Sequence, residues 1–416
     1  DIKTIGVTAT NGKTTINFLL DTIYEIAGFK SGIIGSVLNK TGKRIQTAEL
    51  TTPESLDLQE LFAEMRDNGV QRVAMEVSSS ALELLRADDI EFDVVSFTNF
   101  SREHIDLHGS FERYWEVKSS LIRNAPESAV AVLNVDDSRI ASLYDSMKAK
   151  VIGFSIIGDS GDIVCKNVRL IKGRANFEIH IKHKIDLNHT TIDAGSFPVS
   201  MGIPGYHSVE NGMAAAVIAL VDGISRDTIA KALKSFQGVE RRFEFIFEED
   251  FTIVDDHFAN IKNINSTLGT LADMGKSKLH IVYAIRGNRG TTVNRENAEA
   301  LVVWKDKLGI KELTATRSIG SVGWKDQVAP EEEEVFREVI DKSDLELKVY
   351  DTLKEAIYEV LSKIEKDDIV LLAGCQGMDK GARTAFDILA EIRPGIDIDK
   401  LYSPLRRRVS EQPYQL

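Results

Sequence analysis

Runs of β-branched and apolar residues alternate with helical periodicity through the first third of the chain. The first run, Ile2–Thr8, ends at a turn of Gly, Asn and Lys, and apolar residues then recur at helical spacing through Thr15–Ala27. The alternation continues, with strands expected at Val70–Glu76, Asp93–Thr98 and Ala129–Asn134 and helices at Leu56–Asp67 and Phe111–Arg123. This order predicts a parallel α/β sheet that is covered by helices on both faces.

The pattern changes near Val151, where the runs become shorter and more closely spaced. We expect antiparallel strands here, laid beside the parallel sheet, at Val151–Phe154, Ile163–Ile171, Ala175–Ile181 and Asp186–Ile192. Helical periodicity returns at Val209–Val221 and Ser225–Phe236.

A second α/β unit is expected after the Gln237–Gly238 turn. It contains a helical segment at Ile264–Met274, and its predicted strands are Phe251–Asp255, Leu279–Ala284, Lys311–Thr316, Leu345–Val349 and Ile369–Ala373. This pattern is typical of a doubly wound, Rossmann-like sheet. The sequence therefore predicts two domains, residues 1–238 and residues 239–416.

Composition narrows the classes of partner. The chain has 416 residues, 43% of them hydrophobic, and a net charge of −13, which argues against a nucleic acid or an anionic membrane as the partner. Its two cysteines cannot form a disulfide framework or a four-cysteine zinc site, and no run is long enough to span a bilayer. We expect a cytoplasmic protein. Because the sequence begins at Asp1 on a predicted strand, we also expect that an upstream segment is missing from it.

Residues Thr8–Thr15 read TATNGKTT and join the first strand to the first helix. In such a loop, backbone N–H groups point at phosphate oxygens, the lysine reaches the β- and γ-phosphates, and the hydroxyl after it ligates Mg²⁺. The predicted nucleotide-binding residues are Thr10, Asn11, Gly12, Lys13, Thr14 and Thr15. A plain strand-to-helix turn is the alternative.

The TNGKTT segment resembles the phosphate-binding loop of the Mur ligases and of their folylpolyglutamate and cyanophycin synthetase relatives. Those proteins usually carry Gly where this chain has Ala9, so we expect ordinary backbone torsions at Ala9. Thr51-Thr52-Pro53-Glu54 is similar to the TTPD segment of the MurE branch, in which the paired hydroxyls meet a nucleotide-sugar peptide. A helix start with Thr52 as its N-cap is the alternative for this segment.

Three further segments match the family in order. Ala74–Leu82 with Arg86 resembles AMEVSSHAL…R, which implies Glu76 as a Mg²⁺ ligand and Ser78 and Arg86 as substrate contacts. The family's His and Gln are Ser80 and Leu84 here, so this part of the substrate site differs.

Phe97–Gly109 resembles FTNLSRDHLDYHG, and the resemblance implies His104 as a second metal ligand. Lys118 lies where MurE-type enzymes carry an N6-carboxylated lysine that holds a second Mg²⁺. An ordinary helix lysine is the alternative for Lys118.

The remaining matches concern the nucleotide. Pro204–Asn211 resembles PGxHNxxN and implies that Asn211 contacts the adenine. Arg242 and Asp255 match family residues that contact ATP, whereas His257 is one place out of register and is not assigned.

The motifs of the C-terminal domain differ from those of the family. The DNPR motif of the diaminopimelate-adding enzymes is replaced by Leu313–Ser318, which disfavours that activity, and Arg286, Arg289 and Arg317 remain as candidates to grip a carboxylate. These divergent motifs fit an archaeal pseudomurein ligase as well as they fit a peptidoglycan ligase.

The resemblance implies an ATP-dependent amide ligase with two Mg²⁺ ions. It would activate the carboxylate of a nucleotide-linked peptide as an acyl phosphate, which a free amino acid then attacks. The family's nucleotide-sugar domain does not appear in this sequence. The alternative to a missing upstream segment is an acceptor that is recognised mostly through Thr51, Thr52, Ser78 and Arg86, and we expect a monomer. The alternatives are a folylpolyglutamate-type ligase of a cofactor precursor, a P-loop NTPase without ligase activity, and a Mur-like scaffold without catalysis.

Overall fold

The computed structural model describes residues 2–101, 108–171, 173–275 and 277–408. It divides into two compact units, Asp1–Phe236 and Gln237–Leu416, and each is considered by itself. The sequence prediction placed this division at residue 238.

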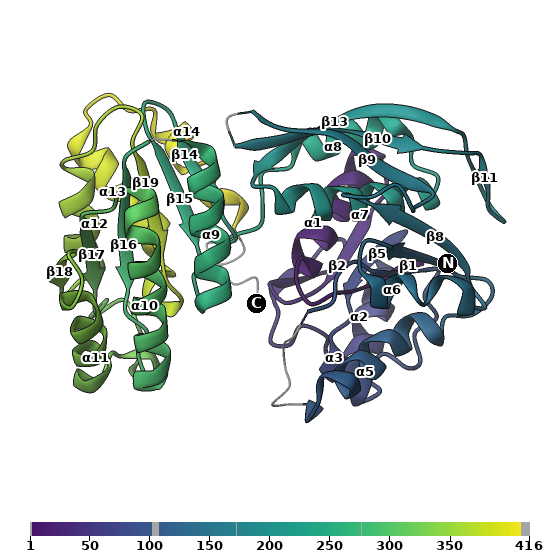
Figure 1. The fold of residues 1–416 in the computed structure, drawn as a ribbon, viewed down its shortest axis with the longest axis horizontal. Coiled ribbons are helices and arrows are strands. Elements are labelled where there is room, and N and C mark those ends of the chain that lie inside the picture. Colours follow the sequence, from purple (N-terminus) through teal and green to yellow (C-terminus); the bar gives the residue numbers. More distant parts are fainter. Residues whose placement is uncertain (1, 102–107, 172, 276, 409–416) are drawn as a thin grey trace. The chain divides into compact units, whose positions relative to one another are not determined.

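The first unit is built on one sheet, in the strand order β13-β10-β9-β8-β7-β6-β1-β5-β2-β3-β4 (Figure 1). Its strands are β1 (Lys3–Thr8), β2 (Ser31–Ile34), β3 (Leu38–Lys40), β4 (Ile45–Thr47), β5 (Arg72–Glu76), β6 (Val94–Phe97), β7 (Val130–Asn134), β8 (Lys150–Ser155), β9 (Ile163–Ile171), β10 (Arg174–Ile181) and β13 (Gly195–Pro204). Its helices are α1 (Lys13–Ile26), α2 (Ser55–Asp67), α3 (Ser79–Glu83), α5 (Phe111–Arg123), α6 (Ser138–Ala141), α7 (His207–Val221) and α8 (Arg226–Ser235). The central strands β2, β5, β1, β6 and β7 run parallel. The alternating pattern predicted all of them except β2, and it also missed the short strands β3 and β4.

The predicted antiparallel region needs two corrections. Residues Val151–Phe154 belong to β8, which pairs in parallel with β7 and extends the parallel sheet instead of starting a new one. The predicted strand Asp186–Ile192 is two short strands, β11 (Ile185–Asp186) and β12 (Thr191–Ile192), and the long strand β13 was not predicted. Pro198 hid β13 in the sequence. Because β13 is the edge strand, its residues need ladder hydrogen bonds on one side only, so a proline is tolerated there.

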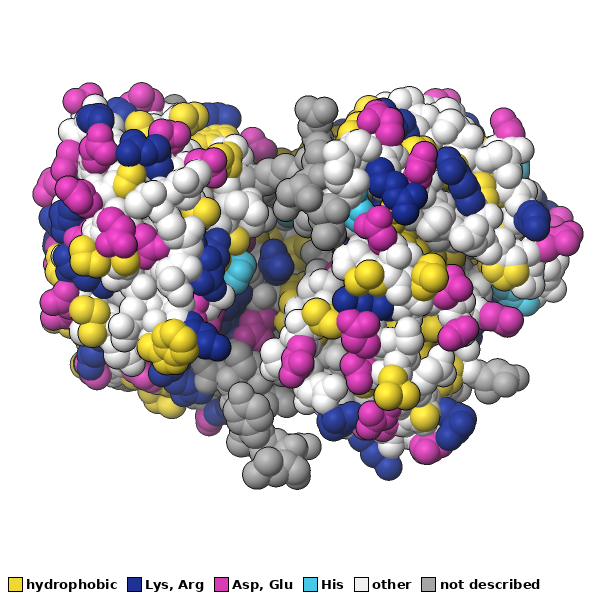
Figure 2. Space-filling view, turned by 90° about the horizontal axis from the view of Figure 1, so that it is seen from below, with side chains coloured by type: hydrophobic (Ala, Val, Ile, Leu, Met, Phe, Trp, Pro, Cys, Tyr) yellow, Lys and Arg dark blue, Asp and Glu magenta, His cyan; other side chains and the backbone are white. Residues whose placement is uncertain are grey.

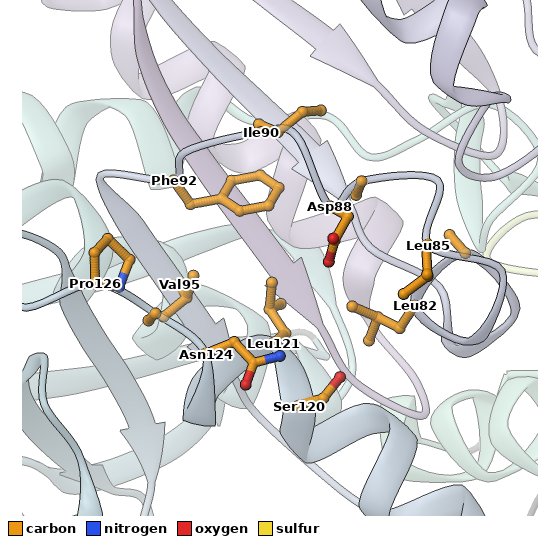
Figure 3. Close-up of a pocket in the computed structure, with 13 residues that line it drawn as sticks. Leu82, Leu85, Asp88, Ile90, Phe92, Val95, Ser120, Leu121, Asn124 and Pro126 are labelled. Carbon is orange, nitrogen blue, oxygen red and sulfur yellow. The ribbon is translucent and has the colours of Figure 1, made fainter.

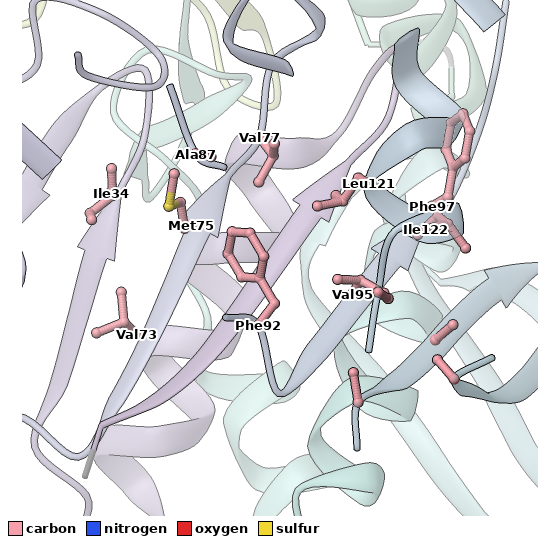
Figure 4. Packing of buried hydrophobic residues seen from close by; sticks show 14 of the residues in the cluster. Ile34, Val73, Met75, Val77, Ala87, Phe92, Val95, Phe97, Leu121 and Ile122 are labelled. Atoms are coloured by element: carbon pink, nitrogen blue, oxygen red, sulfur yellow. The ribbon is translucent and has the colours of Figure 1, made fainter. Parts of the chain in front are cut away.

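The interior of the first unit on one side of this sheet is a continuous apolar cluster. Figure 4 shows side chains of β5 and β6, among them Val73, Met75 and Val95, packing against Phe92, which precedes β6, and against Leu121 of α5. Burial of these side chains fixes α5 against β6, and α5 carries Lys118 on its inner face.

The second unit has a six-stranded sheet in the order β14-β15-β19-β16-β17-β18. Its strands are β14 (Glu244–Glu248), β15 (Thr252–Asp256), β16 (Leu279–Ala284), β17 (Glu312–Thr316), β18 (Glu346–Tyr350) and β19 (Ile369–Ala373). Its helices are α9 (Ile261–Met274), α10 (Gly290–Leu308), α11 (Pro330–Asp341), α12 (Leu353–Leu361), α13 (Gly381–Ile392) and α14 (Ile398–Tyr402). All pairs are parallel except β14 with β15, and one apolar cluster lies on each face, so the predicted doubly wound sheet is confirmed apart from the unpredicted edge strand β14.

Acidic and basic side chains are interspersed over the face shown in Figure 2, with scattered hydrophobic side chains between them. Within the described ranges, no helix combines the length and the apolar character needed to cross a bilayer. The two cysteines, Cys165 in β9 and Cys375 after β19, are both buried, and burial raises the pKa of the Cys165 thiol to about 12.

Candidate functional site

The loop between β1 and α1 has the geometry of a phosphate-binding loop. Gly12 is the N-cap of α1 with φ 87°, which an L-residue rarely adopts, whereas Ala9 is not among the residues with positive φ, as predicted. A Cβ on Gly12 would lie 2.2 Å from Oδ1 of Asn211 on α7. The loop therefore needs glycine here for two reasons, and the predicted adenine-contacting residue, Asn211, packs directly against the loop.

Asn99, which follows β6, fixes the shape of this loop. Its Oδ1 accepts from the N–H of Asn11 at 2.9 Å, its amide donates to the carbonyl of Asn11 at 2.9 Å, and its own carbonyl accepts from the N–H of Thr10 at 3.0 Å. The sequence prediction missed Asn99, although it directly follows a buried strand, where polar residues gather at the carboxyl edge of a parallel sheet.

Two lysines converge on one carbonyl oxygen of the loop. Nζ of Lys13 donates to the carbonyl of Ala9 at 2.8 Å, and Nζ of Lys118 donates to the same oxygen at 2.7 Å. Lys118 is 1% exposed, and its side chain extends from α5 under the loop to Thr8 Oγ1 at 3.3 Å. Lys118 is therefore not a surface lysine, and its ammonium group supports the loop from within the unit.

Glu76, at the end of β5, faces the first turn of α1. Its Oε2 accepts from Thr14 Oγ1 at 3.1 Å, and its Oε1 accepts from the backbone N–H of Ser36 at 2.9 Å and from Ser36 Oγ at 3.0 Å. The hydroxyls of Thr14 and Ser36 are 2.9 Å apart. Hydroxyl and carboxylate oxygens are the donors that Mg²⁺ prefers, so these residues fit such an ion. Ser36, which follows β2, was not predicted.

His104, the other predicted metal ligand, lies outside the described residues. Among the described residues, no three His, Cys, Asp or Glu side chains form a metal-binding group.

The predicted substrate residues of the first unit form one hydrogen-bonded group. Thr52 is 1% exposed; its Oγ1 donates to the carbonyl of Glu76 at 2.8 Å, lies 3.3 Å from Ser78 Oγ and accepts from the Ser78 N–H at 3.1 Å. Arg86 donates to the carbonyl of Thr52 at 3.3 Å and pairs with Glu54 at 2.7 Å. Thr51 adjoins this group and is partly exposed. The alternative of a helix beginning at Thr52 is wrong, since α2 begins at Ser55 with Glu54 as its N-cap.

In the second unit, Asp255 is fully buried and not directly accessible. Its carboxylate accepts from Arg408 at 2.7 Å and lies 3.4 Å from Nε of Arg241. Arg241 also donates to the carbonyl of Cys375 at 3.1 Å. Arg242, the arginine predicted to contact ATP, is exposed, in contrast to Arg241 beside it.

Two titratable groups follow Asp255 at the carboxyl end of β15. Burial raises the pKa of Asp256 to about 6, although its carboxylate accepts from the N–H groups of Phe258 and Phe243. Burial lowers the pKa of His257 to about 3, and the neighbouring arginines, including Arg242 and Arg286, lower it further. His257 is therefore neutral at physiological pH.

The three candidate carboxylate-binding arginines of the second unit differ in what they can still bind. Arg317 donates to Glu333 at 2.5 and 2.7 Å and to Asp351 at 2.6 Å, so carboxylates of the chain itself already occupy its guanidinium. Arg289 pairs with Asp326 at 2.9 Å. Arg286 donates to the carbonyl of Ala259 at 2.5 Å, and its buried Nε has no hydrogen-bond partner among the described residues.

Family models cover both units. The Mur ligase middle domain matches residues 7–219, and the Mur ligase glutamate ligase domain matches residues 241–376. A UDP-N-acetylmuramoyl-L-alanyl-D-glutamate–2,6-diaminopimelate ligase from Halalkalibacterium halodurans is 32% identical over 382 residues, which are 90% of this chain and 73% of that protein. The chain belongs to the Mur ligase family.

Solved structures of Mur ligases have the same fold. A diaminopimelate ligase of this kind superposes with a TM-score of 0.65 at 24% identity, covering 90% of this chain and 73% of the other. A pseudomurein peptide ligase type C from Methanothermus fervidus superposes with a TM-score of 0.60 at 19% identity, covering 94% of this chain and 78% of the other. The predicted fold class and family are confirmed, and as a Mur ligase the chain is an ATP-dependent acid–amino-acid ligase.

One cavity of this Mur ligase lies beside the predicted substrate residue Arg86, between Leu85 and Ala87, without being lined by it. It has a volume of about 120 Å³ and lies between α3, the connection to β6, and the end of α5 (Figure 3). Its lining is mostly apolar, with Leu82, Phe92 and Leu121 prominent. None of the residues assigned above to ATP, metal or substrate lines it.

Proposed function

We propose that this Mur ligase adds an amino acid to a carboxylate of a nucleotide-linked cell-wall peptide, in peptidoglycan or pseudomurein precursor synthesis. The observation that supports this most directly is the hydrogen bond from Thr52 to the carbonyl of Glu76. It joins the candidate acceptor residue to the candidate metal ligand, so an acceptor carboxylate and the γ-phosphate of ATP would meet at the end of β5.

The residues of the first unit divide the work of phosphoryl transfer. Backbone N–H groups of the loop orient the phosphates, and Lys13 exchanges its bond to the Ala9 carbonyl for phosphate oxygens, where it spreads the negative charge. Ser78 and Arg86 hold the acceptor so that its carboxylate points at the γ-phosphate. The product is an acyl phosphate, whose carbonyl the amine of the incoming amino acid attacks with loss of phosphate.

Thr14 and Glu76 would hold one Mg²⁺, which supplies charge neutralisation on the β- and γ-phosphates. Lys118 would join a second ion only as its carbamate. Carboxylation would convert the ammonium of Lys118 into an anion, and an anionic oxygen beside the loop could ligate a cation.

The second unit would bind the incoming amino acid. Arg286, with its unpartnered Nε, is a stronger candidate for the amino acid's carboxylate than Arg317, which is already paired. Arg242 and Asp255 would contribute to ATP binding, Asp255 after release from Arg408. We also infer a monomer in the cytoplasm, where ATP and nucleotide-linked precursors are available.

The test is ADP formation with ATP and Mg²⁺ across the twenty amino acids, diaminopimelate, and nucleotide-linked peptides ending in a free carboxylate. We expect turnover that requires both an acceptor and one class of amino acid, and mass spectrometry should find the new amide. Turnover that ignores both substrates would instead identify an NTPase, and turnover only with a folate-like acceptor would identify a cofactor ligase. Lys13→Ala, with the same fold, is the inactive control.

A further inference from the structure

Helix α3 (Ser79–Glu83) lies between two residues of the proposed acceptor site, Ser78 and Arg86. Five residues do not hold a helix by themselves, so its position depends on tertiary contacts. On one side those contacts are incomplete, because Ala81 and Leu82 of α3 line the 120 Å³ cavity (Figure 3). The packing of α3 against α5 is therefore supplemented by polar contacts.

A buried histidine holds both ends of α3. Nε2 of His108 lies 3.0 Å from Oγ of Ser79, the first residue of the helix, and Nδ1 lies 2.6 Å from Oε2 of Glu83, the last residue. The contact with Glu83 has the distance of an ion pair but not the alignment of a hydrogen bond. The side chain of His108 is 0% exposed.

His108 is itself fixed to the phosphate-binding loop through Tyr114 of α5. The two rings stack with centroids 5.2 Å apart and planes 27° apart, and the Tyr114 hydroxyl lies 3.4 Å from Oγ1 of Thr10. Tyr114 is also held by Phe100, 5.0 Å away, so its position does not depend on His108. The imidazole of His108 therefore connects α3 to the Tyr114 ring, which is held beside the phosphate-binding loop.

Serine, histidine and glutamate in this order are also the groups of a hydrolytic triad. Ser79 is 5% exposed and His108 is buried, so a substrate carbonyl has no approach to the serine oxygen. The three side chains are therefore suited to fixing a helix and not to attacking a substrate.

We propose that His108 is a positioning residue that holds α3, and through it Ser78 and Arg86, in register for the acceptor. The proposal rests on the proposed function, since it takes the acceptor to bind at these two residues. Loss of His108 frees α3 toward the cavity side, while the phosphate-binding loop keeps its own anchors.

The test compares His108→Ala with the wild-type enzyme in steady-state kinetics and in nucleotide binding. We expect the KM for the acceptor to rise by about tenfold or more while the Kd for ADP changes by less than about twofold, because the loss is confined to acceptor positioning. His108→Gln, whose amide can still reach Ser79, should recover part of the loss. His189→Ala removes an exposed histidine of the same unit, which contacts the Val221 carbonyl at 3.1 Å, and should leave the acceptor KM unchanged.

A double-mutant cycle guards against a simple folding defect. Ser79→Ala removes only the hydroxyl that contacts Nε2 of His108. It should raise the acceptor KM by a few-fold alone and add nothing to His108→Ala, because the two side chains act as a unit. Additive effects, an unchanged acceptor KM, or a parallel loss of ADP affinity would overturn the proposal.

Hydrogen exchange separates this proposal from the proposed function. In His108→Ala, the amides of Ala81 and Leu82 should exchange about tenfold faster or more, whether or not an acceptor is known. If the wild-type enzyme ligates no acceptor, the proposed function fails, and unchanged exchange in α3 would refute the role of His108 independently.

Discussion

Gly12 allows a quantitative check of the loop geometry, by replacement with alanine. Its φ of 87° costs an L-residue about 1–2 kcal/mol, and the added Cβ would sit 2.2 Å from Oδ1 of Asn211, well inside van der Waals contact. Displacing the buried Asn211 side chain should cost about 1 kcal/mol more. We therefore expect Gly12→Ala to lower the free energy of unfolding of the first unit by about 2–3 kcal/mol.

Gly28 provides a matched control for the backbone part of this cost. It has the same φ of 87°, in the same unit, but a Cβ there would meet nothing within 4 Å. Gly28→Ala should therefore cost only the torsional part, about 1–2 kcal/mol. Asn211→Ala in the Gly12→Ala background should recover about 1 kcal/mol, the part due to overlap.

Urea denaturation followed by Trp115 fluorescence measures these differences. Trp115 is the first unit's only tryptophan, so a background with Trp304→Phe and Trp324→Phe removes the signal of the second unit. Equal losses from the substitutions at Gly12 and Gly28, or no recovery in the double variant, would show that Asn211 does not press on the loop. A Gly12→Ala protein as stable as the wild type would refute the torsional reasoning as well.

Three further predictions concern single side chains. Lys13→Ala should abolish ligation without changing the thermal transition of the first unit, because its ammonium serves the loop and the nucleotide rather than the core; near-normal turnover would contradict this. Lys118→Ala should be nearly inactive, and small carboxylates such as formate should partly restore its activity. The same additives should not rescue Lys13→Ala. Electron density beyond Nζ of Lys118 in a nucleotide-bound crystal would show the carbamate directly. The pKa of Asp256 is raised above its unfolded value of 3.8, to about 6, so its contribution to stability is lost as the pH rises from 4 to 6, by up to about 3 kcal/mol. Asp256→Asn should flatten the pH dependence of the free energy of unfolding in this range, as measured by urea titrations. An unchanged pH dependence would argue against a buried carboxyl.

Sequence periodicity predicted most of the buried central strands, although it missed β2, whose four residues are all buried. The strands around β1 and β5 are rich in buried apolar residues, as expected where both faces of a sheet are covered. The loop before Lys13 was predictable because its Gly, Asn and Lys are contiguous in the sequence. The strands at the edges of the sheets were harder to predict from the sequence. β13 contains Pro198 and Gly202, residues that argue against a strand unless the strand is known to lie at an edge.

The site was predictable where a motif is contiguous and not where it depends on contacts across the fold. Ser36 and Asn99 became visible only once β2 and β6 were placed beside β5 and β1, since nothing next to them in sequence indicates a partner at Glu76 or Asn11. Arg317 shows a different limit of reasoning from sequence. Its residue type suited a carboxylate of the substrate, but Glu333 and Asp351 of the chain itself had already met that need.

The burial of both cysteines has a practical consequence. Cys165 is 4% exposed and Cys375 is 2% exposed, and burial raises the pKa of both thiols, so the native protein should be almost silent toward maleimides at neutral pH. A cysteine introduced at an exposed position of each unit, such as Lys43 and Asp341, would then take up a fluorophore selectively. Energy transfer between the two dyes would follow the separation of the units in single molecules as ATP, acceptor and amino acid are added in turn.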